Sequence, residues 1–112
     1  MRRTIPTVVA LGLVSLASMS SAGEAPSGDA VYRRWCVHCH STGRGNPGTE
    51  SLQVKYKGSK PAALLERTDM TPEFVKLAVR QGVLSMPPFR KTEVTDAELA
   101  VLSTWLASGG KR

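Results

Sequence analysis

The sequence predicts a small all-helical domain. Four segments begin with a capping residue or a proline, as helices do, and they cover about residues 28–36, 61–67, 71–81 and 96–108. The one segment with strand-like alternation, residues 52–57, is too short and too isolated to form a sheet. The 112 residues suffice for one domain, and no internal repeat divides them.

The first 22 residues have the features of a secretory signal. Arg2 and Arg3 give a basic start, and residues 8–17 form an apolar run of ten, too short to span a bilayer comfortably. Small residues at 20–22 offer a cleavage site after Ala22. We therefore expect a signal peptide over 1–22, a short tether over 23–27, a domain over 28–107 and a tail over 108–112. Export to the periplasm of a Gram-negative bacterium follows, with no stable membrane insertion after cleavage; an uncleaved, anchored form is the alternative.

The charge balance is mild. Loss of Arg2 and Arg3 with the signal lowers the lysine and arginine count from 15 to 13 against nine acidic residues, which leaves a net charge of +4. No basic run is interleaved with aromatic residues, so nucleic acid is not an expected partner. An acidic patch on a partner protein is compatible with this charge.

The first predicted helix leads into the most informative stretch of the chain. Ser27 can cap this helix, and Val31, Tyr32 and Trp35 mark its apolar side. Residues 36–40 then read Cys-Val-His-Cys-His, the attachment pattern for c-type haem. Cys36 and Cys39, one helical turn apart, can each bond a vinyl group of the porphyrin, and His40 is then carried beneath the iron.

Other uses of two nearby cysteines fit the chain less well. A dithiol redox motif needs a βαβ context, and a zinc site needs a second Cys/His pair. The chain has only two cysteines and two histidines, all inside this pentapeptide. His38 is expected to be an exposed bystander.

Glycines and a proline predict a loop over residues 41–48, and residues 52–57 are expected to be extended or a single helical turn. Residues 61–67 predict a short helix opened by Pro61. Thr71 and Pro72 begin a stronger helix that stops at Gly82. Residues 83–89 are extended because two prolines forbid a helix. Thr95 and Glu98 form a capping box for the last helix.

Met86 is the candidate for the sixth iron ligand. It lies in Ser-Met-Pro-Pro-Phe, where prolines stiffen the backbone, and a thioether suits low-spin iron and raises the reduction potential. Met70 precedes a helix cap without such a brace and is expected to fill the core. An open or water-ligated iron is the remaining alternative.

Taken together, these segments resemble a class I cytochrome c over residues 28–107. The resemblance implies helices wrapped around one covalently attached haem c, with Gly28 and the aromatic pair Tyr32 and Trp105 at the crossing of the first and last helices. It also implies that the carbonyl of Pro47 accepts a hydrogen bond from His40. Tyr56 and Arg80 are candidates for hydrogen bonds to the haem propionates, and ordinary surface roles for both remain open.

Several shorter motifs are similar to the cytochrome subunits of 4-cresol dehydrogenase and of eugenol-type hydroxylases. They lie at residues 55–58, 67–72, 79–82 and 86–93. This similarity implies a flavin-dependent alkylphenol dehydrogenase as electron donor.

The sequence therefore predicts a periplasmic carrier of single electrons, not an enzyme. It would accept electrons from a periplasmic dehydrogenase, with a flavoprotein as the candidate, and pass them to a downstream cytochrome, cupredoxin or oxidase. Surface cations that could steer an acidic partner are Arg33, Arg34, Arg90 and Lys91. The alternatives are an open-site haem sensor or peroxidase-like enzyme, and a permanent haem subunit of a larger oxidoreductase complex.

Overall fold

The computed structural model describes residues 23–111, so the predicted signal segment lies outside the described residues. The elements, in chain order, are α1 (Gly28–Trp35), α2 (Val37–His40), α3 (Pro47–Tyr56), the 3₁₀ turn η1 (Leu64–Glu66), α4 (Pro72–Gln81) and α5 (Asp96–Ala107). Across residues 23–111 the only strand-like feature is an isolated bridge between Val83 and Met86. The prediction of an all-helical fold is therefore confirmed.

Three helices begin as their local sequences predict. Ser27 and Thr71 each accept a hydrogen bond at 3.2 Å from the backbone N–H three positions further on. Thr95 accepts one from the Glu98 backbone at 3.2 Å, and the Glu98 carboxylate accepts one from the Thr95 N–H at 2.8 Å, which completes the capping box. α4 ends at Gly82, whose φ of +72° suits glycine.

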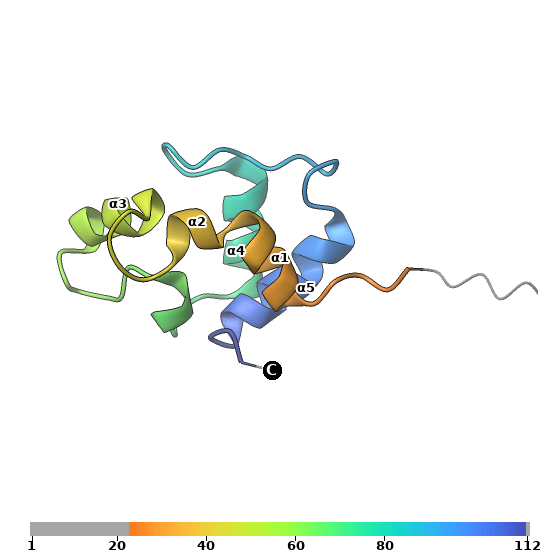
Figure 1. Ribbon diagram of the computed structural model, residues 1–112, viewed down its shortest axis with the longest axis horizontal. Coiled ribbons are helices and arrows are strands. Elements are labelled where there is room, and N and C mark those ends of the chain that lie inside the picture. The colour runs from red at the N-terminus through yellow and green to blue at the C-terminus, as the bar shows by residue number, and fades with distance from the viewer. Residues whose placement is uncertain (1–22, 112) are drawn as a thin grey trace, which may run out of the picture.

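The last helix organises the molecule, because α5 packs against both α1 and α4 (Figure 1). At the crossing with α1, a Cβ on Gly28 would overlap the Trp105 side chain and lie 2.7 Å from the Val101 carbonyl oxygen. Only glycine permits this approach. The rings of Tyr32 and Trp105 lie there with centroids 5.4 Å apart.

The buried core lies where α1, α4 and α5 meet. It contains aliphatic side chains from all three helices, together with Tyr32, Cys36 and Met70. Met70 is 7% exposed and packs in this core. On α4 the buried side chains are Val75 and Val79.

The expectation for residues 52–57 was wrong, because residues 52–56 belong to the ten-residue helix α3. Pro47 takes the first helical position, and Lys57 ends the helix in the left-handed conformation. Alternation of apolar residues did not produce a strand because no partner strand is available, and Val54 is 76% exposed. The predicted loop accordingly ends at Asn46.

The short helix expected over residues 61–67 is reduced to the three-residue turn η1. Ala62 and Ala63 are buried, and Ala63 has extended backbone angles. Burying both alanines in an extended segment leaves too few residues for a full helical turn before Arg67, which is again extended.

Candidate functional site

The five residues Cys36–His40 form one compact turn. Cys36 ends α1 by donating its N–H to the Tyr32 carbonyl at 2.8 Å. Its own carbonyl accepts from the N–H groups of Cys39, at 3.1 Å, and His40, at 3.0 Å. α2 therefore carries Cys39 and His40 on a single turn that starts from Cys36.

Both cysteines are free, with Cys36 buried and Cys39 exposed. Burial, followed by the proximity of Cys39, raises the pKa of the Cys36 thiol to about 11. A dithiol redox centre requires a lowered cysteine pKa, whereas the pKa of Cys36 is raised. Residues 23–111 also contain no group of three or more His, Cys, Asp or Glu side chains that could hold a metal ion.

His40 is partly buried and His38 is exposed. Burial lowers the pKa of His40, so its imidazole is neutral at pH 7 and has a lone pair for a metal. Its Nδ1 atom is buried and makes no hydrogen bond. The structure therefore contains no hydrogen bond from His40 to the Pro47 carbonyl, and the role of this carbonyl stays a prediction.

Gly48 is the residue that lies directly against the histidine ring. A Cβ at this position would be 2.8 Å from Cε1 and 2.9 Å from Nδ1 of His40, and 2.7 Å from the Cys39 carbonyl oxygen. The absence of a side chain therefore lets the first turn of α3 cover the imidazole. Sequence reasoning placed Gly48 in a loop and missed this role; its position beside Pro47 was the available signal.

The loop between α2 and α3 is closed by polar contacts. The Asn46 amide donates to the carbonyls of Thr42 and Gly43, both at 3.1 Å, and accepts from the Ser41 hydroxyl at 2.8 Å. The Thr49 hydroxyl, fully buried, donates to the Ser41 carbonyl at 2.7 Å. These contacts hold α3 to α2 beside His40.

Met86 lies on the segment between α4 and α5 and is partly buried against the core. Its backbone pairs with Val83 through two hydrogen bonds, 2.9 and 3.1 Å long. Its carbonyl passes so close to Gly82 that a Cβ there would lie 2.5 Å from the oxygen. The Met86 backbone is thus held at the end of α4.

Tyr56 belongs to a cluster that the sequence did not reveal. Arg67, only 6% exposed, donates through Nη1 to the Tyr56 hydroxyl at 3.0 Å and forms two bonds with the Asp69 carboxylate, at 2.8 and 2.9 Å. Lys60 reaches the same carboxylate at 2.9 Å. The guanidinium of Arg67 also lies over the rings of Tyr56 and Phe74. We define these five residues as the Arg67 cluster; it has two cations and one anion.

Arg80 binds a backbone carbonyl and a carboxylate of the chain. Its Nη1 donates to the Phe89 carbonyl at 3.1 Å and its Nη2 to Asp96 at 2.8 Å. The guanidinium of Arg80 is therefore engaged by two groups of the chain, and its role toward a propionate stays a prediction.

The residues present suit a covalently attached haem. Two free thiols can bond the vinyl groups of the porphyrin. A neutral imidazole and a thioether are ligand types of c-type haem iron. On α4, Phe74 and Leu77 are about half exposed and lie outside the face that packs on α5, so they offer apolar surface to a flat ring. Four buried polar atoms have no partner within the described residues, and the Nδ1 atom of His40 is one of them.

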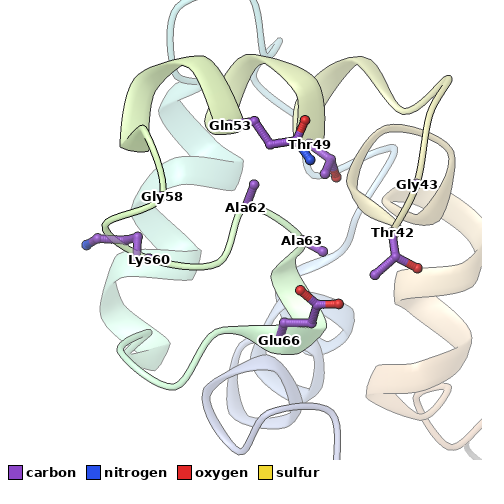
Figure 2. Close-up of a pocket in the computed structure, with 9 residues that line it drawn as sticks. All are labelled: Thr42, Gly43, Thr49, Gln53, Gly58, Lys60, Ala62, Ala63 and Glu66. Carbon is purple, nitrogen blue, oxygen red and sulfur yellow. The ribbon is translucent and has the colours of Figure 1, made fainter.

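A separate hollow lies on another part of the described surface. It has a volume of about 250 Å³ and lies between α3, the segment around Gly58–Ala63 and η1 (Figure 2). Its lining includes Lys60 and Glu66, but none of Cys36, Cys39, His40 and Met86. It is therefore not the site that the pentapeptide predicts.

Most cations expected to steer a partner are paired within the chain. Arg33 binds Asp29 at 3.0 Å and Lys91 binds Asp96 at 2.9 Å. Arg90 lies 3.7 Å from Glu93. Arg34 lies over the Trp35 ring at 5.2 Å. No helix within residues 23–111 is long and apolar enough to cross a membrane.

Comparisons with known proteins assign the chain to a family. Residues 23–106 match the model of the family described as cytochrome c oxidase, cbb3-type, subunit III. The chain is 44% identical over 59 residues to dihydro-heme d1 dehydrogenase of Pseudomonas aeruginosa; the matched part is 52% of this chain and 12% of that relative. The chain thus spans a small part of the relative's length. No solved structure matches the chain significantly.

Proposed function

The chain belongs to the family of c-type cytochrome domains that includes subunit III of the cbb3-type oxidase, and we propose that it is an exported carrier of single electrons. Membership means that the domain binds haem c covalently and transfers electrons through it. Haem c supplies an iron that alternates between the ferrous and ferric states. The chain's own residues bind this group, orient it and set its potential.

This proposal depends mainly on one observation: residues 36–40 form a single turn. Cys36 and Cys39 would form the two thioether bonds, and His40, neutral at pH 7, would bind the iron. Gly48 would keep the imidazole ring in its orientation. The prolines after Met86 would hold its thioether ready as the other axial ligand, which favours a higher potential.

In this proposal, the Arg67 cluster binds a haem propionate. Arginine has five N–H donors, and three contacts to Asp69 and Tyr56 leave donor capacity for a carboxylate. The excess of one positive charge in the cluster favours an anion. In this proposal Tyr56 keeps the role predicted for it, and Arg67 replaces Arg80.

The partners are proposed from the motifs and from one relative. The similarity to cytochrome subunits of alkylphenol oxidations favours a periplasmic flavoprotein dehydrogenase as the donor. The relative named dihydro-heme d1 dehydrogenase also supports a dehydrogenase in this role. A downstream cytochrome, cupredoxin or oxidase would take the electron. The arginine pair and apolar run at residues 2–17 support export to the periplasm.

The ligand assignment is tested by absorption spectra of protein expressed with a haem-attachment system. We expect a low-spin ferric protein with the far-red band of methionine–iron ligation. Met86→Ala should keep the haem, open the sixth position and lower the midpoint potential, whereas Met70→Leu, the matched control, should change neither. An unchanged potential in Met86→Ala removes Met86 from its role, and a high-spin wild type that binds carbon monoxide favours an open-site sensor.

The donor is tested by mixing ferric protein with a flavin-dependent alkylphenol dehydrogenase and its substrate. Reduction of the haem within the turnover time of the enzyme is the expected result. Gel filtration of material from the host separates a free carrier from a permanent subunit. A haem that is reduced no faster than by substrate alone would reject this donor class.

A further inference from the structure

The Arg80 side chain joins α4, the Met86 segment and α5. We propose that Arg80 is a positioning residue that clamps the segment bearing Met86, and that this clamp controls how readily the methionine leaves the iron. The inference rests on the proposed function, because it takes Met86 as an axial ligand. It gives Arg80 a role different from the propionate contact expected from the sequence.

The clamp acts on Phe89. The Phe89 N–H donates to the carbonyl of Val79 at 2.8 Å, and the Phe89 carbonyl accepts from Arg80 Nη1 at 3.1 Å. Two successive residues of α4 therefore hold both backbone polar groups of Phe89. The Phe89 ring also packs edge-on against Trp35, with centroids 5.9 Å apart, and Trp35 directly precedes Cys36. Phe89 thus connects the two segments proposed to bind haem.

The backbone between Phe89 and Met86 is stiff. Pro87 and Pro88 each have a fixed φ angle, so two of the backbone torsions between the clamp and the methionine cannot relax. On its other side, Met86 is paired with Val83 and crosses over Gly82. A shift of Phe89 is therefore passed to Met86 instead of being absorbed along the chain.

The second arm of Arg80 fixes the guanidinium. Nη2 binds Asp96 at 2.8 Å, and Lys91 binds the other oxygen of this carboxylate at 2.9 Å. Asp96 is the first residue of α5, where a negative charge is favoured by the helix dipole. The Arg80 side chain is only 22% exposed, whereas that of Asp96 is 65% exposed, so water and salt reach this ion pair from the aspartate side. The bond from Arg80 to the Phe89 carbonyl is partly buried.

The clamp predicts an effect on ligand exchange at the iron. Arg80→Leu keeps the apolar stem but removes both bonds, which frees the Phe89 carbonyl. A hydrogen bond with a charged donor is worth about a tenfold change or more in an equilibrium. We therefore expect cyanide to bind the ferric Arg80→Leu protein about tenfold faster than wild type, with a weaker methionine–iron band. Arg80→Lys, which can make one of the two bonds, should fall between them.

Arg33→Leu is the matched control. It also loses an arginine–aspartate pair, but this pair joins Arg33 and Asp29 within α1 and makes no contact with the Met86 segment. Thermal unfolding of all variants reports general destabilisation separately from cyanide binding. If Arg80 is a clamp, its loss in Arg80→Leu speeds cyanide binding more than the Arg33→Leu change does. The comparison is made at a temperature where both variants are fully folded.

The possible failures differ from each other. If wild type shows the methionine–iron band and cyanide binds Arg80→Leu and Arg33→Leu at equal rates, the clamp is overturned and Met86 remains the ligand. If wild type lacks the band, the ligand assignment is overturned, and the clamp's function is overturned with it.

Discussion

At the scale of single residues, a missing side chain is as important as the ligands themselves. Gly48 lies against the His40 ring and the Cys39 carbonyl, with no room for a Cβ. The neighbouring backbone cannot move freely, because the polar contacts of Asn46 and Thr49 close the loop around it. The orientation of the imidazole therefore depends on a residue that has no chemistry of its own.

Gly48→Ala should consequently destabilise the protein by about 1–3 kcal/mol, the usual cost of overpacking a tight site. The measurement is the free energy of unfolding of the haem-loaded protein in denaturant. Gly23→Ala is the control, since a Cβ there would meet nothing within 4 Å. Equal stabilities of the two variants would contradict the close contact seen at His40.

At the scale of elements, a helix could be predicted where the residues that start it lie within one turn of each other. α1, α4 and α5 were predicted because Ser27, Thr71 and the Thr95–Glu98 box act within one turn. α3 was missed because its apolar residues alternate and its one fully buried residue is Thr49, a polar one. The spacing of apolar residues therefore did not predict α3.

In the candidate site, too, contiguous residues could be predicted and residues far apart in the chain could not. The pentapeptide could be read directly because its residues are contiguous, whereas Arg67 meets Tyr56 from eleven positions away. The contacts of Arg80 could not be predicted because its partners lie nine and sixteen positions further along the chain. No pattern in the sequence links residues at such separations, so only the fold identifies these contacts.

The Arg67 cluster makes a prediction about pH. Hydrogen bonds from Arg67 and then from Lys60 hold the pKa of Asp69 well below its usual range. Since the folded pKa is depressed, the stabilisation is fully present above the unfolded carboxyl pKa of about 3.9 and is lost as the pH falls through the folded value. Asp69→Asn should therefore be less stable than wild type at pH 5–7, and the gap should shrink below about pH 4.

Denaturant unfolding of both proteins over a pH series measures this gap. Glu73→Gln, a change at an exposed carboxylate of α4, should show no comparable gap. A difference between wild type and Asp69→Asn that persists undiminished at pH 3 would show that the carboxylate charge is not what stabilises the cluster.

At the scale of the whole molecule, the helices are unequally supported by protein contacts. α5 packs against α1 and α4 around the core, whereas α3 packs closely only on α2. α3 buries just Thr49 and leaves Val54 mostly exposed. Helices of this length are marginal without packing of an apolar face. The proposed haem, held by α2 and bordered by the Arg67 cluster, would be the missing support for α3.

The double variant Cys36→Ala/Cys39→Ala, which cannot bind haem covalently, tests whether α3 depends on haem for its stability. Without haem we expect the amides of α5 to remain the best protected from hydrogen exchange, and those of α3 to exchange close to the rate of an unfolded chain. In the haem-loaded wild type, α3 should gain protection of about tenfold or more. Haem staining on denaturing gels verifies that the variant carries no cofactor. If α3 is protected equally with and without haem, the contacts of α3 with α2 are sufficient by themselves, and the cofactor is not part of what folds this half of the molecule.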